Sequence, residues 1–136
     1  VNAVYRRCQA DLAHRLIDSA PQGAPARELF RHWWWGLCNF AREEPEASCF
    51  LEMHHHELYL EPESFAERDR IRQVAGQLIL GAQASGEVRH APPDILGFLV
   101  TGAYVGILKA VGERGEVLTD ETIALAEECV WKMLEA

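Results

Sequence analysis

The chain has 136 residues, of which 49% are hydrophobic, and its formal net charge is −8 at pH 7. This composition is typical of one folded domain and unlike a disordered segment. So acidic a chain is poorly suited to holding nucleic-acid phosphates over a broad face. No uninterrupted run of 18 apolar residues and no apolar N-terminal stretch occurs, so neither a membrane span nor a signal peptide is expected.

The four cysteines are scattered along the chain with no C-x-x-C spacing. They are therefore expected to be reduced thiols of a cytoplasmic protein, most of them buried as small hydrophobic side chains.

The N-terminal half of the chain predicts three helices. The first covers residues 2–19, where apolar residues recur every three to four positions. The second covers residues 26–43 and follows Pro25, a residue suited to the first turn of a helix. The third covers residues 45–60, because the Glu61-Pro62 step that comes next is incompatible with continued helix.

The C-terminal half predicts three more helices. Ser64 with Glu67 three residues later is the pattern of a capping box, and Gly86 suits the position just beyond the end of that fourth helix. The fifth helix covers residues 94–111, and Thr119 is a suitable N-cap for the sixth. No internal repeat is present, so the prediction is one all-α domain, residues 1–136, with six helices.

The fifth predicted helix contains the segment ILGFLVTGAYVGIL, which is apolar on every side. Such a helix must be covered on every side. It could be a central core helix of one subunit, or its free side could pack against a second copy of the chain. In the second case the last two helices of both copies form a four-helix dimer interface. The expected interface residues are Gly102, Gly106, Ile123, Ala126, Val130 and Met133.

The segment FLEMHHHELYL, residues 50–60, raises the question of a metal site. Consecutive helical residues point about 100° apart, so His54, His55 and His56 cannot all bind one ion. A Glu-x-x-His pair occurs in di-iron helical bundles, where it appears twice, but Glu52 with His55 is a single pair here. A metal-binding protein or metalloenzyme using Glu52 and His55 or His56 remains the alternative, and no metal or cofactor is expected.

Catalysis is not expected, because no G-x-S-x-G nucleophile motif and no glycine-rich phosphate loop is present.

The three consecutive tryptophans, Trp33 to Trp35, carry more information. Three adjacent indoles point in three directions, and rings with a polar tip suit the lining of a cavity or an interface. Ordinary core packing with one exposed ring is the competing interpretation.

Residues 33–60, WWWGLCNFAREEPEASCFLEMHHHELYL, resemble the C-terminal effector-binding domain of TetR-family (tetracycline-repressor-like) transcription regulators. A helix of the form W-x-x-L-x-x-F-A ending before a proline is matched by Trp34 to Pro45, and F-L-E-x-H-x-H-x-x-Y-L by residues 50–60. Residues 86–89 resemble the family's G-x-(I/V)-R turn, and residues 101–106 its penultimate helix. Residues 1–19 resemble the connector that comes after the DNA-binding unit.

The resemblance implies a ligand-sensing and dimerising domain of a one-component regulator. Its effector would change DNA binding by an N-terminal helix-turn-helix module, which is expected to precede Val1 and is absent from this sequence. The expected effector is a small apolar or aromatic molecule in a cavity enclosed by the second, third, fourth and fifth helices, with no membrane partner. The expected lining is Trp33, Trp34, Phe50, Met53, His54, Glu57, Tyr104 and Leu108. A different role, fixing helix packing, is predicted for Glu52, His56 and Tyr59.

Overall fold

The computed structural model describes residues 1–53 and 58–136, and nothing is described of the side chain of Met53. These residues form six α-helices and two shorter helical turns, with no β-strand among them. The all-α prediction is therefore confirmed. The helices are α1 (Asn2–Ala13), α2 (Ala26–Glu43), α3 (Pro45–Met53), α4 (Ala66–Ala84), α5 (Pro93–Glu113) and α6 (Asp120–Leu134). The turns are the π-helical η1 (His14–Asp18), which continues α1, and the 3-10 helix η3 (Pro62–Phe65) before α4.

The helix ends show which local signals the folded chain uses. Gly86 has a φ of +81° beyond α4, and the next backbone N–H, that of Glu87, donates to the Ala82 carbonyl at 2.9 Å. This is the predicted left-handed glycine cap. The Thr119 hydroxyl accepts a hydrogen bond from the Thr122 N–H at 3.2 Å, so the predicted N-cap of α6 is also present.

The predicted capping box at Ser64 is absent from the structure. No side chain caps α4, and Ser64 lies inside η3, where only 1% of its surface is exposed. Its hydroxyl instead donates a hydrogen bond to the side-chain oxygen of Asn2 at 2.5 Å. The same Asn2 oxygen accepts from the backbone N–H of Glu61 at 3.0 Å. Tertiary contact with the start of α1 has therefore replaced the local cap.

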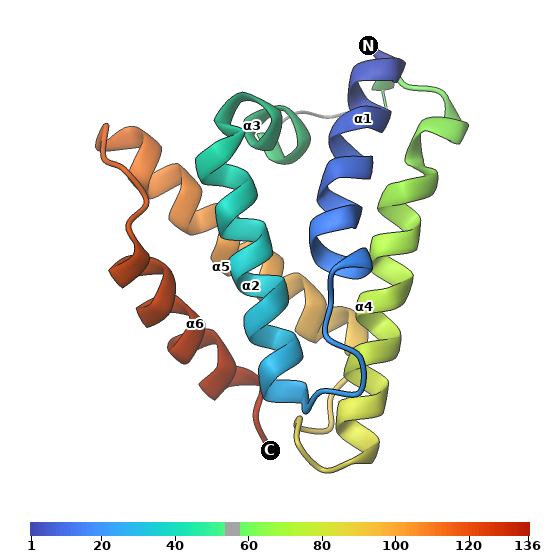
Figure 1. Ribbon diagram of the computed structural model, residues 1–136, viewed down its shortest axis with the longest axis vertical. Helices are drawn as coiled ribbons and strands as arrows, with labels where there is room; N and C mark the ends of the chain where they lie inside the picture. Colours follow the sequence, from blue (N-terminus) through green and yellow to red (C-terminus); the bar gives the residue numbers. More distant parts are fainter. Residues whose placement is uncertain (54–57) are drawn as a thin grey trace.

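Helix α2 runs through the middle of the molecule (Figure 1). Helices α1 and α4 lie side by side on one flank, and α6 packs against α2 on the other. Helix α5 crosses behind α2, and α3 covers one end of the bundle. Each face of α2 therefore meets a different neighbour, which makes it the element that connects the two flanks.

The interior consists of two hydrophobic clusters. One, the α2–α6 cluster, joins α2, α5 and α6, and its buried members include Trp34, Cys38, Tyr104, Ile123 and Val130. The other, the α1–α3 cluster, joins α1, α3 and the start of α4. Its buried members are Tyr5, Leu12, Leu16, Phe40, Leu51, Leu60 and Phe65.

Helix α5 is left largely uncovered by its own chain. Phe98 is 64% exposed, and Ile95 and Leu99 are each almost half exposed. Its most apolar 18-residue window has a mean hydropathy of 1.8 and is only 11% buried. By length and composition alone, this helix could cross a membrane, although Thr101 interrupts the apolar run. The sequence predicts that the apolar side chains on every side of α5 must be buried, and the other helices of this chain bury only some of them.

Candidate functional site

Tyr104 of α5 forms hydrogen bonds with α2 and α3 in the region of the predicted pocket. It is 2% exposed, and its hydroxyl lies 3.2 Å from the Leu37 carbonyl of α2 and 3.1 Å from the Ser48 hydroxyl of α3. Burial raises the pKa of Tyr104 well above its ordinary value, so it is a neutral hydrogen-bonding group. The chain of contacts from Leu37 through Tyr104 to Ser48 fixes the spacing of α2, α3 and α5.

Glu52 lies one helical turn beyond Ser48, so the two side chains share a face of α3. Burial raises the pKa of the Glu52 carboxyl, and the charge of Arg72 on α4 acts in the opposite direction. The Glu52 charge in turn contributes to the raised pKa of Tyr104. Within the described residues, no hydrogen bond or ion pair satisfies this carboxylate.

The sequence predicts a helix-packing role for Glu52, and that role stays a prediction. The sequence signal for its loss of solvent contact is its position inside the apolar run FLEM. A carboxylate in an apolar run costs free energy unless something pairs with it.

The three tryptophans of α2 have three different environments, as their spacing predicted. Trp34 is fully buried, and its indole N–H donates to the Ile123 carbonyl at 3.1 Å, so it anchors the α2–α6 cluster. The Trp35 N–H donates to Glu127 at 2.7 Å. Trp33 packs beside the α1–α3 cluster, and its indole nitrogen is buried without a hydrogen-bond partner in the described part of the chain.

The other residues predicted to line the pocket are dispersed. The Phe50 ring meets Tyr5 of α1 edge-on, with centroids 6.2 Å apart, and packs in the α1–α3 cluster. Leu108 borders a surface hollow of about 370 Å³ between α2, α3 and the end of α5. His54, Glu57 and the side chain of Met53 lie outside the described residues. The structure therefore brings Trp34, Tyr104 and Leu108 together at the α2–α6 cluster, and it places Phe50 against the α1–α3 cluster.

The alternative metal site involves His55 and His56, which also lie outside the described residues. Among the residues that the structure does describe, no three His, Cys, Asp or Glu side chains are grouped as a metal ion would require. Nothing in the described coordinates therefore supports the metal-binding alternative.

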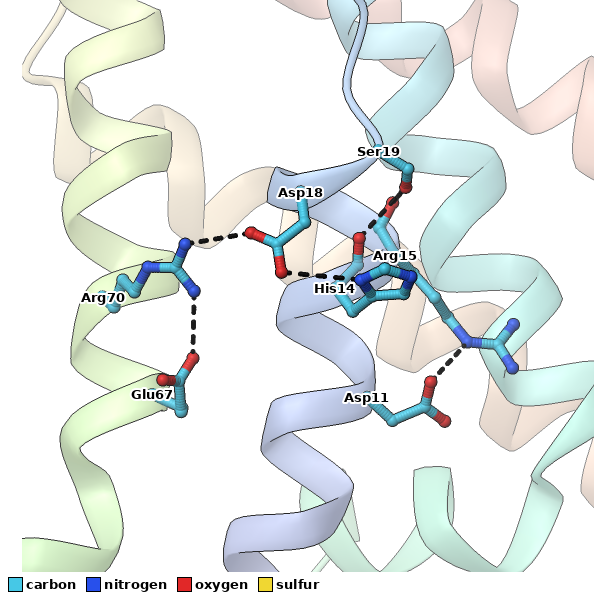
Figure 2. Close-up of polar contacts among 7 residues, drawn as sticks. All are labelled: Asp11, His14, Arg15, Asp18, Ser19, Glu67 and Arg70. Atoms are coloured by element: carbon cyan, nitrogen blue, oxygen red, sulfur yellow. Dashed lines mark hydrogen bonds and ion pairs between the residues drawn. The ribbon is translucent and has the colours of Figure 1, made fainter.

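A surface network holds the end of α1 to its neighbours (Figure 2). Arg70 of α4 donates to Asp18 of η1 at 3.1 Å and to Glu67 at 3.2 Å, and His14 lies 3.5 Å from Asp18. The hydrogen bond from Arg70 is the main cause that lowers the pKa of Asp18. On the other side, Arg15 donates to Glu43 of α2 at 2.8 Å. The π-helical turn is therefore linked to both α4 and α2.

Glu127 of α6 forms buried polar contacts with α2. It is 4% exposed, and it pairs with Arg27, with Arg31 at 2.9 Å and with the Trp35 indole. Burial acts to raise the pKa of Glu127, but the hydrogen bonds from Arg31, Trp35 and Arg27 together hold it below the ordinary value. A buried carboxylate with this many donors is a structural group.

The predicted dimer residues of α6 face the chain's own core. Ile123 and Val130 are 1% and 7% exposed in the α2–α6 cluster, and Ala126 and Met133 pack against the same cluster. These four residues face inward because they form the apolar stripe with which α6 packs against α2. The apolar surface left free on the last two helices is formed by Ile95, Phe98, Leu99 and Leu125, beside the exposed Gly102 and Gly106.

The sequence and the fold were compared with known proteins. Residues 5–136 match the family described as tetracyclin repressor-like, C-terminal domain. A TetR family transcription regulator from Marinobacter aquaeolei VT8 has a similar structure, with a TM-score of 0.81 and 21% identity over 98% of this chain and 70% of that one. A protein with unknown function from Rhodococcus sp. RHA1 gives a TM-score of 0.71 and 17% identity over 99% and 70%. No curated protein matches the sequence. Since the family match spans nearly all of its residues, the chain belongs to the tetracyclin repressor-like C-terminal domain family of TetR transcription regulators.

Proposed function

We propose that this chain is the ligand-sensing and dimerisation domain of a TetR-like transcription regulator. A small apolar or aromatic effector binds it and changes DNA binding by an N-terminal helix-turn-helix module. The observation that carries the proposal is the family match over residues 5–136. The charge of −8 agrees with it, because DNA contact is then left to a different module.

The uncovered side of α5 supports dimerisation. Phe98 and its exposed apolar neighbours form a patch of the kind that marks a protein interface. At Gly102 and Gly106, a β-carbon would meet no atom within 4 Å, so a helix of a second copy has room to approach. The high hydropathy of α5 is then that of an interface helix, which needs no membrane.

Oligomeric state tests this part of the proposal. Light scattering after size exclusion is expected to give a dimer for the wild type. Phe98→Arg is expected to give a monomer, because it places an unpaired charge in the interface. Leu80→Arg is the matched control, since Leu80 is a 55% exposed apolar residue of a different helix, α4. A wild-type monomer at micromolar concentration would overturn the proposed dimerisation.

The region around Tyr104 supports effector binding. The Tyr104 ring is buried edge-on against Trp34, with ring centroids 6.5 Å apart, and its hydroxyl bonds to Ser48 of α3. Leu108, one helical turn further along α5, lines a hollow that Ser48 also borders. Ligand sites combine apolar walls with a few convergent polar groups of this kind. The remaining predicted lining residues stay predictions: Trp34, Phe50, Met53, His54, Glu57 and Leu108.

A compound screen tests the sensing role. An effector is expected to raise the melting temperature by mass action and to change tryptophan fluorescence. The same compound should change operator binding by a full-length protein that carries the DNA-binding module. Compounds that stabilise the domain but leave operator binding of the full-length protein unchanged would contradict the regulatory role.

A further inference from the structure

We propose that residues 83–91, which span the end of α4 and the turn before α5, form a conformational joint. The joint couples the end of α4 to the start of α2 and to the end of α6, so that both of these helix ends loosen together when it is disturbed. The inference goes beyond the proposed function, because the coupling requires neither an effector nor a second copy of the chain.

The tripeptide Gly-Glu-Val follows two helices of this chain, and a comparison of the two turns separates local contacts from tertiary ones. It occurs after α4 as residues 86–88 and after α5 as residues 115–117. The two glycines have φ values of +81° and +64°. In both turns the glutamate N–H donates to the carbonyl five residues earlier, at 2.9 Å for Glu87 and at 3.0 Å for Glu116. The geometry that ends the helix is therefore the same in both turns.

The two turns differ in their contacts with the rest of the molecule. Val88 is 5% exposed, whereas Val117 is 78% exposed. The Glu87 carboxylate accepts two hydrogen bonds. The Glu116 side chain forms no hydrogen bond or ion pair with any described residue. The tertiary contacts of residues 86–88 are therefore additional to what the end of a helix requires.

At the start of α2, the Glu87 side chain acts as a cap from a distant part of the chain. The first N–H groups of a helix have no acceptor within it, and Pro25, the residue before α2, provides no side-chain cap. One oxygen of Glu87 accepts from the Ala26 N–H at 3.2 Å, and the other accepts from the Ser85 hydroxyl at 2.7 Å. A negative charge also suits the positive end of the helix dipole. The first turn of α2 therefore depends on the position of Glu87.

At the end of α6, the backbone of the same turn forms an isolated antiparallel bridge with the residues after the helix. The Arg89 N–H donates to the Leu134 carbonyl at 2.9 Å, and the Ala136 N–H donates to the Glu87 carbonyl at 3.2 Å. Leu134 is the last residue of α6, and the last carbonyls of a helix lack a partner within it. Residues 87–89 therefore complete the last turn of α6 as well as the first turn of α2.

Gln83 holds this turn to α4. It is 9% exposed, and its side-chain amide donates to the Arg89 carbonyl at 3.0 Å and to the Ala91 carbonyl at 2.7 Å. The end of α4, the start of α2 and the C-terminus lie together at one end of the molecule, away from α3 (Figure 1). Since these three ends share one set of hydrogen bonds, a displacement of the end of α4 must either break those bonds or move the other two ends.

Amide hydrogen exchange of the 136-residue protein, measured by mass spectrometry, tests the inference without an effector. Glu87→Ala should increase the exchange rates roughly three- to tenfold, both in residues 26–30 and in residues 134–136. Gln83→Met should give the same two increases, although the side-chain hydrogen bonds of Gln83 reach neither helix end. Glu87→Gln keeps an acceptor oxygen and should retain most of the protection.

Glu116→Ala is the matched control, because it removes the same side chain from the same tripeptide and changes the net charge equally. It should leave the exchange of both segments unchanged. Residues 5–12 of α1 are the internal reference, and their exchange should be the same in every variant.

Faster exchange at the start of α2 alone would make Glu87 a local cap and overturn the joint. Unchanged exchange in residues 134–136 of Gln83→Met would overturn it too, and so would an equal increase in residues 5–12, which indicates a general loss of stability. If Glu87→Ala fails to fold, Gln83→Met decides the question by itself. None of these results bears on effector binding or dimerisation, so the proposed function is tested separately.

Discussion

The two flanks of α2 are held by different kinds of interaction. Toward α6, the contacts are buried: Trp34 donates into the backbone of α6, and Glu127 of α6 receives two arginines and an indole from α2. Toward α1, Phe40 of α2 packs in the α1–α3 cluster, and the polar contacts are ion pairs at the surface, such as Arg15 with Glu43. A further surface pair, Asp18 with Arg70, joins η1 to α4 (Figure 2). Buried, fully satisfied contacts define one geometry, whereas solvated ion pairs contribute little and exchange easily.

This difference divides the molecule into a rigid part and an adjustable part. The buried polar contacts make the α2–α6 pair the more rigid side, whereas the surface ion pairs of η1 can exchange at small cost while the apolar side chains of α1 stay packed in the α1–α3 cluster. A ligand contacting Tyr104 would sit where the two parts meet, because Tyr104 belongs to the α2–α6 cluster and bonds to α3. Substitutions in each part test that division, beginning with the largest expected effect.

Trp34→Ala should cause the largest loss of stability, about 3–5 kcal/mol. It removes a fully buried ring from the α2–α6 cluster together with its hydrogen bond to the Ile123 carbonyl. Urea unfolding monitored by circular dichroism measures the change. Trp33→Ala is the comparison, and an equal loss in both variants would show that the two flanks are equally rigid.

Glu127→Gln should lower the free energy of unfolding by about 2–3 kcal/mol. The effect is at the lower end for a buried ion pair, because Arg31 is more than half exposed. The pKa of Glu127 is lowered in the folded state, so its stabilisation is present above about pH 4.5, its ordinary value, and is lost as the pH falls through the lower folded pKa. Unfolding curves between neutral pH and strongly acidic pH should therefore converge for the two proteins, and a constant difference would refute the assignment.

Gly36→Ala tests the junction of α2 with η1. A β-carbon at Gly36 would lie 2.9 Å from the Cδ2 atom of Leu16 and 3.5 Å from the Arg15 carbonyl. The Leu16 side chain can adjust, so the expected cost is about 1 kcal/mol. Gly76→Ala on α4 is the control, because nothing lies within 4 Å of its β-carbon and the exchange should be neutral or stabilising. A Gly36→Ala protein as stable as the wild type would show that η1 yields more easily than the packing indicates.

Arg70→Ala should have the smallest effect on global stability, because Arg70 and Asp18 are both solvent-exposed. The unfolding midpoint should stay within experimental error, while amide exchange in residues 14–19 becomes faster than in the wild type. Raising the salt concentration should reproduce part of that increase in the wild type only. Unchanged exchange would mean that the ion pairs do not hold the turn.

The fold could be predicted from local signals in most places, and prediction failed where tertiary contacts competed. The bounds of α2, the Gly86 cap and the Thr119 cap were predictable, because each depends on residues a few positions apart. Ser64 has the sequence of a cap but contacts Asn2 instead, and no local pattern encodes a partner 62 positions away. Residues 2–19 were predicted as one regular helix, because apolar periodicity does not distinguish its α-helical part from the π-helical turn at its end.

The site was less predictable than the fold. Periodicity shows that a residue is buried but not against which helix, so Trp34 and the Ile123 stripe were assigned to a pocket and an interface although they pack in the core. The surroundings of Glu52 could not be predicted, because the charge of Arg72 and the hydroxyl of Tyr104 that interact with it come from other helices. The divergence of the three indoles needed only helix geometry and was predicted correctly.

The π-helical turn also constrains how this part of the chain can change in length. In a regular α-helix, side chains three apart share a face, but here Arg15 reaches α2 and Asp18 reaches α4 across the wider turn. Deleting one residue between His14 and Asp18 would restore the ordinary pitch and rotate the residues after the deletion by roughly 100°. A relative whose first helix ends without a π-helical turn should therefore also lack the acid at position 43 or the arginine at position 70, because the side chains at positions 15 and 18 could not reach both partners.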